Sequence, residues 1–128
     1  MIIYLIPTDI KNFPIICNFD NMELIREHLE ELHSLCERHK VKELYVFGSF
    51  LTHSFNKDSD IDFLVKFENV DPLNYFDNYM DCKESLEKLF HRDVDLVEVQ
   101  TVKNPILKRS IDQSKIILYG RADSKVAI

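Results

Sequence analysis

The first long stretch with a clear hydrophobic period runs from residue 20 to residue 40. Its apolar positions recur at spacings of four, three and four, as on one face of an α-helix. They are Ile25, Leu29, Leu32 and Cys36. Asp20, followed three residues later by Glu23, resembles a capping box with aspartate in the place of serine or threonine. The pattern therefore predicts one amphipathic helix that begins near Asn21.

Four short segments have the length and the β-branched, aliphatic and aromatic composition of strands. They are residues 43–49, 60–67, 93–99 and 115–120. The first and the last of these segments hold the only two glycines of the chain, Gly48 and Gly120. The apolar run near the start, IIYLI, is compatible with an additional edge strand.

Two further helices are expected where a polar residue precedes proline, because proline suits the first turn of a helix. One begins at Asp71-Pro72 and carries an apolar side made of Phe76, Met80, Leu86 and Leu89. A shorter one begins at Asn104-Pro105 and carries Ile106, Leu107 and Ile111. The order helix, strand, strand, helix, strand, helix, strand indicates a mixed α/β or α+β fold.

Composition and charge indicate which broad classes of protein the chain can belong to. The chain has 128 residues, 45% hydrophobic and 30% charged, without low-complexity tracts, which favours a single globular domain over residues 1–128. Its start lacks a basic leader and the roughly 18 uninterrupted apolar residues of a membrane span, so we expect a cytoplasmic protein without membrane contact. The net charge of −6 disfavours a long nucleic acid partner, since duplex binding draws on a basic face.

Three aspartates form the most informative constellation. Asp60 and Asp62 are two apart at the start of a predicted strand, so their carboxylates project from one face while Ile61 points into the core. Asp95 lies inside a later apolar strand, where a charge is unfavourable unless it is paired or bound to a metal. If the two strands are neighbours, the three carboxylates can converge on a hard cation such as Mg²⁺. This arrangement indicates metal-assisted phosphoryl or nucleotidyl transfer.

Gly48 and Ser49 fit the phosphate side of that chemistry. A strand that ends in glycine lets the backbone approach phosphate oxygens, and the amides and hydroxyl that follow can donate hydrogen bonds to them. Residues 50–59 are expected to form a short helical turn and a loop that returns the chain alongside the first strand. Alone, Gly-Ser is usually a turn and Asp-x-Asp a solvated strand edge, but their ordered combination is far more specific.

The histidines favour structural or solvated roles. His28, His33 and His39 are five and six residues apart, so no two of them share a helix face as a pair of zinc ligands would. We therefore expect them at the surface. His53 lies inside the motif loop, where a solvated histidine is a simpler interpretation than a phosphate ligand.

Cysteines and helix aromatics also favour structural roles. The three cysteines are odd in number and widely separated, which fits neither a disulfide framework nor paired zinc ligands, so we expect buried thiols. They are Cys17, Cys36 and Cys82. Tyr75, Phe76 and Tyr79 are expected to pack the helix that contains them.

The ordered motifs resemble a known family, the minimal nucleotidyltransferases of the DNA polymerase β superfamily. Residues 48–62 read Gly-Ser, ten residues, Asp-Ile-Asp, and residues 94–97 read Val-Asp-Leu-Val. The ending at residues 103–120 is also similar to the tail common in that group. The resemblance spans about residues 22–120, with a motif core of about 43–99, and leaves residues 1–19 as an extension of unassigned structure. It implies a palm-like mixed β-sheet flanked by helices, with one or two Mg²⁺ ions and a nucleoside triphosphate, usually ATP.

The resemblance also implies roles for the motif residues. Asp60 and Asp62 would hold the metal ions, and Asp95 would share one ion and accept the proton of the attacking hydroxyl. Gly48 and Ser49 would cradle the triphosphate, and pyrophosphate would leave in line with the attack.

Small members of this family resemble the antitoxins of HEPN/MNT toxin–antitoxin pairs, which transfer AMP from ATP to a tyrosine of a HEPN ribonuclease and silence it. We expect that function here, with the toxin as partner and a homodimer or a hetero-oligomer with the toxin as the assembly. Two alternatives stay open: transfer to a small molecule such as an aminoglycoside, and toxin binding without catalysis. The second is motivated by Thr52 and His53, where many members have arginine and glycine. Lys57, Arg92 and Arg109 are candidates to replace the missing positive charge.

Overall fold

A computed structural model describes the backbone of residues 19–120 and the side chains of residues 21–120. The expected strand near the start and Cys17 lie outside these residues. The elements follow one another as α1 (Phe19–Glu27), α2 (Leu29–Arg38), β1 (Val41–Phe47), the 3₁₀ turn η2 (Gly48–Leu51), β2 (Ile61–Phe67), α3 (Pro72–Phe90), β3 (Val94–Glu98), the 3₁₀ turn η3 (Val99–Thr101), α4 (Pro105–Ser114) and β4 (Ile116–Tyr119).

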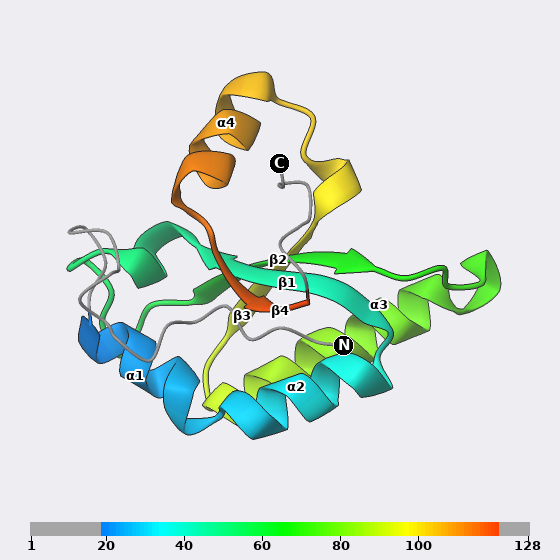
Figure 1. Cartoon of the computed structure of the whole chain (residues 1–128), viewed down its shortest axis with the longest axis horizontal. Helices are drawn as coiled ribbons and strands as arrows, with labels where there is room; N and C mark the ends of the chain where they lie inside the picture. The colour runs from blue at the N-terminus through cyan, green and yellow to red at the C-terminus, as the bar shows by residue number, and fades with distance from the viewer. Residues whose placement is uncertain (1–18, 121–128) are drawn as a thin grey trace.

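The strands form one mixed sheet in the order β3-β2-β1-β4. β1 pairs antiparallel with β2 and β4, whereas β2 and β3 run parallel because α3 carries the chain back between them. α1, α2 and α3 cover one face of the sheet, and α4 lies over the other (Figure 1). The predicted mixed α/β architecture is thus confirmed.

Strand alternation divides the apolar residues between the two faces of the sheet. The larger cluster lies under α1, α2 and α3, and its strand members include Leu44, Val46, Ile61, Phe63 and Val65. The smaller cluster lies on the α4 side and is built on Tyr45, Leu64 and Ile111. Asp62 lies on the α4 side as well, because it is two residues before Leu64 and next to the buried Ile61. The alternation therefore keeps its carboxylate out of the main core.

The single helix predicted for residues 20–40 is in fact two helices, and this prediction was wrong. The break is at His28, whose amide bonds the Ile25 carbonyl at 3.0 Å, one residue closer than in an α-helix. The ring of His28 lies edge-on to Phe90, with 5.5 Å between ring centroids, which holds the tightened turn in place. α1 begins at Phe19, and the proposed cap of Asp20 falls on a side chain outside the described residues.

His33 is buried, which corrects the expectation that all three helix histidines lie at the surface. Only 6% of it is exposed, and its Nε2 lies 2.8 Å from the carbonyl oxygen of Leu118. Burial lowers the pKa of His33, so the ring is neutral at neutral pH. The spacing carried no information on β4, whose residues Leu118 and Tyr119 contact His33.

α3 begins as predicted, with the Asp71 side chain accepting the Leu73 amide at 3.0 Å. Its buried residues are Cys82, Leu86 and Phe90, all in the half that packs against the sheet. Phe76 was expected in the apolar stripe but is 69% exposed, because the first turns of α3 extend past the sheet (Figure 1). Cys82 and Cys36 are buried thiols, as expected. Within the described residues, no helix is long and apolar enough to cross a membrane.

Candidate active site

Asp62 and Asp95 face each other across two parallel strands. The register of β2 and β3 pairs Asp62 directly with Asp95, and Ile61 with Val94. The sequence analysis took the adjacency of these strands as a condition, and the structure meets it and brings the two carboxylates to the same face. Asp60 comes just before β2 and is exposed, and Asp95 is exposed too. Asp95 lies within β3 as predicted, between the buried residues Val94 and Leu96, but its own side chain is exposed, because β3 is the edge strand and Asp95 is on the face that α1, α2 and α3 leave open.

Asp95 and Asp60 are close enough to Asp62 to affect its titration. Burial, followed by the charges of Asp95 and Asp60, raises the pKa of Asp62 to about 6. Like charges that share a site raise a pKa in this way, because ionising the second group is unfavourable beside the first. A cation placed between them would remove that cost.

The donor set of this site fits Mg²⁺. Carboxylate oxygens are the ligands that this ion prefers, and Asp62 carries the charge penalty that an ion would relieve. As they stand, no three His, Cys, Asp or Glu side chains between residues 21 and 120 form a group that could hold a metal ion. Binding would therefore have to draw the three carboxylates together, and their role as ligands stays a prediction.

Position 48 requires glycine for two reasons, its backbone conformation and the nearby side chain of Asp62. Its φ of +76° lies in the left-handed region that side chains disfavour, and a Cβ built on it would overlap the Oδ2 atom of Asp62. Gly48 thus lies directly against the carboxylate of Asp62, because the preceding residue, Phe47, pairs with Asp62 in the sheet. Its expected contact with phosphate stays a prediction, but the close approach of the two motif halves is observed.

The turn after Gly48 is held rigidly from both sides. Phe50 and Leu51 are buried in the main core, which anchors η2 to the sheet. The Asn21 side chain on α1 donates hydrogen bonds to the carbonyl oxygens of Phe50, at 2.8 Å, and Thr52, at 3.3 Å. Ser49, between these anchors, is therefore fixed in place beside the carboxylates. The expected short helical turn is confirmed, although it starts at Gly48.

Arg92 organises the loop that joins η2 to β2. Its Nη1 donates to the carbonyl oxygens of Asn56, at 3.1 Å, and Ser59, at 2.9 Å, and its guanidinium lies 4.6 Å from the centre of the Phe55 ring. These contacts show that Arg92 holds the loop, and its candidate role in binding phosphate stays a prediction. Lys57 and Arg109, the other two candidates, are exposed, as is the loop histidine His53.

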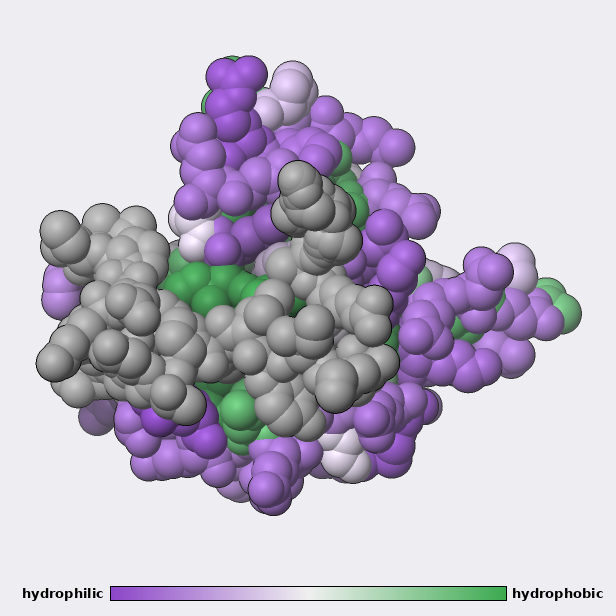
Figure 2. Space-filling view, viewed as in Figure 1, coloured by the Kyte–Doolittle hydropathy of each residue, from purple (hydrophilic) through white to green (hydrophobic). Residues whose placement is uncertain are grey.

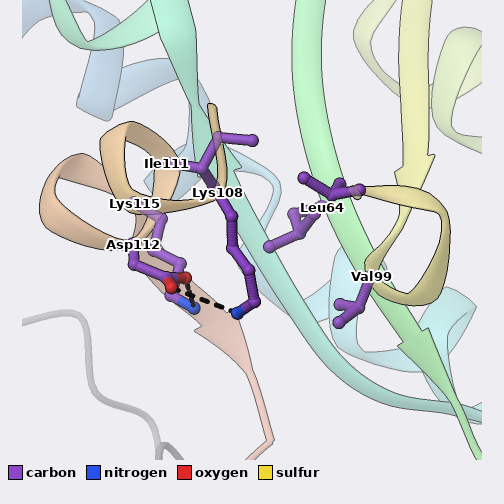
Figure 3. Close-up of a pocket in the computed structure, with 7 residues that line it drawn as sticks. Leu64, Val99, Lys108, Ile111, Asp112 and Lys115 are labelled. Atoms are coloured by element: carbon purple, nitrogen blue, oxygen red, sulfur yellow. Dashed lines mark hydrogen bonds and ion pairs between the residues drawn. The ribbon is translucent and has the colours of Figure 1, made fainter. Parts of the chain in front are cut away.

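Two lysines that the sequence reasoning missed, Lys108 on α4 and Lys115 directly after it, line a cavity on the α4 side of the sheet (Figure 3). Lys108 and Lys115 both pair with Asp112, at 3.3 and 2.9 Å, and Lys115 also lies 4.4 Å from the centre of the Tyr45 ring. They line a cavity of about 50 Å³ whose floor includes Leu64, two residues from Asp62 on the same face. A cavity of that size holds one or two water molecules, not a nucleotide base. The spacing of four between Lys108 and Asp112 on α4 was the available signal.

Comparison with known proteins places the chain in a family. The model for polymerase β nucleotidyltransferases matches residues 30–124. The protein adenylyltransferase MntA of Thermococcus cleftensis is 38% identical over 88 residues, which are 62% of this chain and 86% of that protein.

Solved structures agree with this assignment. A minimal nucleotidyltransferase aligns with a TM-score of 0.62 and 33% identity, over 74% of this chain and 93% of that chain. A chain from the complex of the tri-AMPylated Shewanella oneidensis HEPN toxin with its MNT antitoxin shares the fold, with a TM-score of 0.52 and 21% identity over 75% of this chain and 72% of that one. The resemblance seen in the motifs is confirmed, and this chain belongs to the polymerase β family of nucleotidyltransferases.

Proposed function

We propose that this protein is an antitoxin that transfers AMP from ATP, in the presence of Mg²⁺, to a tyrosine of a HEPN-domain toxin. The observation that carries the proposal is the pairing of Asp62 with Asp95 across parallel strands, with Gly48 directly against Asp62. Three acidic groups can bind metal ions, and the backbone of Gly48 beside them can approach phosphate oxygens, so together they suit the binding of a metal-bound triphosphate.

Each motif residue has a part in the reaction. Asp60 and Asp62 would hold the metal, with Asp95 as a shared ligand, and bound Mg²⁺ would neutralise charge on the triphosphate. The tyrosine oxygen attacks the α-phosphorus of ATP, the bond to the β-phosphate breaks, and pyrophosphate leaves. Asp95 would accept the proton from that tyrosine. Gly48 and Ser49 provide amides and a hydroxyl toward the phosphates.

The choice of acceptor rests on the relatives. MntA of Thermococcus cleftensis is named a protein adenylyltransferase, and one fold neighbour comes from a complex of an MNT antitoxin with a tri-AMPylated HEPN toxin. Both support a protein as the acceptor over an aminoglycoside. A tyrosine is the matching acceptor for Asp95, since its hydroxyl must lose a proton as the phosphorus–oxygen bond forms.

The test is a transfer assay with α-labelled ATP, Mg²⁺ and a purified HEPN-domain protein as the partner. Wild type is expected to label the partner on tyrosine, and Asp60→Ala and Asp95→Ala to reduce labelling by at least a hundredfold. Asp58→Ala, which removes an exposed aspartate of the same loop, serves as the matched control and should label like wild type. Retained labelling in Asp95→Ala, or label only on added small amines or alcohols, would refute the proposal.

A second function, toxin neutralisation by binding alone, is favoured by one observation. The side chains between residues 21 and 120 form no ready-made group of three metal ligands. If binding alone is the function, Asp60→Ala and Asp95→Ala will neutralise the toxin as well as wild type does, and wild type will transfer no label.

A further inference from the structure

Lys115 lies in the same row of the sheet as the carboxylates of the candidate active site. β4 pairs antiparallel with β1, and Lys115, the residue directly before β4, comes next to Phe47. Phe47 pairs with Asp62, and Asp62 pairs with Asp95. We propose that Lys115 binds the β- and γ-phosphates of the nucleotide and stabilises the pyrophosphate that leaves. This inference rests on the proposed function and adds a cationic ligand to the same site.

The face of the sheet that carries the Lys115 side chain is also the face that carries Asp62. The Nζ of Lys115 lies 4.4 Å from the centre of the Tyr45 ring, and Tyr45 belongs to the smaller apolar cluster on the α4 side. Tyr45 is two residues before Phe47 on β1, so the ammonium lies one row of side chains, or roughly 7 Å, from the row of Asp62. Across the strands, the backbones of Lys115 and Asp62 are two spacings apart, or about 10 Å. A flexible four-carbon stem spans much of that separation.

The helix that precedes Lys115 contacts the turn predicted to bind phosphate. α4 packs against η2, in which Gly48 lies against Asp62 and Ser49 follows. The backbone N–H of Lys115 donates to the Ile111 carbonyl oxygen at 2.8 Å, which ties the lysine to the end of α4. Lys115 is therefore anchored between the sheet and a helix that touches the turn.

The proposed reaction puts the leaving group on the Lys115 side of the site. Asp95 is on the edge strand β3, and the tyrosine that would give its proton to Asp95 attacks from there. Displacement at phosphorus is in line, so pyrophosphate leaves on the side away from the attacking oxygen. From Asp95, that direction crosses Asp62 and leads toward Gly48 and Lys115. As the α-phosphorus–oxygen bond breaks, its electron pair stays on pyrophosphate, and the ammonium would donate hydrogen bonds to those oxygens.

Lys115 can change partners without leaving a carboxylate unpaired. It is paired with Asp112 at 2.9 Å, and Lys108 is paired with the same carboxylate at 3.3 Å (Figure 3). When Lys115 turns to a phosphate, Asp112 keeps Lys108. Figure 2 shows mostly hydrophilic surface over α4, so the charged groups there exchange partners in contact with water. Because partly exposed ion pairs contribute little to stability, exchanging this one for a more highly charged triphosphate is favourable.

The test separates the ammonium of Lys115 from the ion pair that it makes. Lys115→Met keeps the stem and removes the charge, whereas Asp112→Asn breaks the same ion pair and keeps the lysine. Lys88→Met changes the net charge equally at an exposed lysine of α3, the helix on the other face of the sheet. The readouts are the Kd of ATP with Mg²⁺ and the Kd of AMP, both measured by calorimetric titration without a partner protein.

We expect Lys115→Met to raise the Kd of ATP by about tenfold, as the loss of one charged hydrogen bond does. The Kd of AMP should change by less than about twofold, because AMP lacks the phosphates that Lys115 would bind. Asp112→Asn should leave the Kd of ATP unchanged or lower it, since the ammonium loses a competing partner. Lys88→Met should change it by less than about twofold, because salt screens distant charges.

The two proposals fail in different ways. If Lys115→Met binds ATP as wild type does, or if Asp112→Asn weakens ATP binding equally, the phosphate role of Lys115 is overturned, while labelling of the partner by wild type leaves the transferase standing. If wild type binds ATP but labels no partner, the transferase proposal fails, and a selective rise in the Kd of ATP for Lys115→Met still supports the phosphate site. Lys115→Gln repeats the comparison should thermal melts show that Lys115→Met is unfolded.

Discussion

Replacing Asp62 by asparagine is expected to stabilise the metal-free protein while destroying its activity. The substitution keeps the shape of the side chain but removes a charge that burial, and then the charges of Asp95 and Asp60, make unfavourable. The pKa of Asp62 is higher in the folded protein than in the unfolded chain. Between the two pKa values, the folded protein therefore holds a proton on Asp62 that the unfolded chain has released. Stability therefore falls as the pH rises from about 4 to about 6, and the full penalty is present above that range.

The size of this effect follows from the pKa. A rise from 3.8 to about 6 corresponds to at most about 3 kcal/mol, since each pKa unit is worth about 1.36 kcal/mol. Asp62 is only half-buried, and solvent screening reduces such terms, so we expect a gain of about 1–2 kcal/mol for Asp62→Asn at pH 8. At pH 4 wild-type Asp62 is itself neutral when folded, and the two proteins should agree to within about 0.5 kcal/mol.

Urea unfolding in EDTA at pH 4, 6 and 8 measures the difference directly. Asp77→Asn, which removes a charge that does not contribute to the pKa of Asp62, is the control and should show no such pH dependence. A gain that is equal at pH 4 and pH 8, or a loss of stability at pH 8, would refute the view that burial and the neighbouring carboxylates raise the pKa of Asp62 in the folded protein. Adding Mg²⁺ at pH 8 should stabilise wild type more than Asp62→Asn, because an ion bound to the carboxylates favours the folded state.

Further predictions concern three other positions. Gly48→Ala should destabilise the protein by about 1–2 kcal/mol or more, from backbone strain and from the overlap with Asp62, and urea unfolding measures the loss. Arg92→Ala should free the η2–β2 loop, seen as faster hydrogen exchange over residues 52–59 with the exchange of α3 unchanged. His33→Phe should cost about 1–3 kcal/mol at pH 7 by leaving a buried carbonyl oxygen without its donor. Because the pKa of His33 is lowered, wild type should also lose stability as the pH falls below about 6.5, and His33→Phe should lose less, as followed by thermal melts.

The features that local pattern determines were predictable from the sequence. β2 and β3 were recognisable because they are short apolar runs, and α3 because Asp71 and Pro72 mark its start. Their adjacency was only a condition in the sequence reasoning, since a parallel pair depends on how the intervening helix packs. That condition is met, and it is what brings Asp95 next to Asp62.

Features that depend on distant packing were not predictable. The burial of His33 depends on Leu118, 85 residues away, and the exposure of Phe76 depends on where the sheet ends under α3. Helical periodicity identifies an apolar side but not how much of it another element covers. In the same way, the sequence offered Arg92 as a phosphate ligand, and only the structure shows it bonded to the loop backbone.

The loss of folding stability that the carboxylates cause also helps to distinguish AMP transfer from toxin binding without catalysis. Strand alternation puts Asp62 on the α4 side of the sheet, so the main core under α1, α2 and α3 would lose nothing if that position held asparagine or serine. A protein that only binds a toxin would gain stability from such a change and lose no function. An enzyme that needs the metal cannot make the change. If Asp62→Asn proves more stable at pH 8 by the expected amount, the charge is being kept at a cost, and catalysis is the physical reason that explains it.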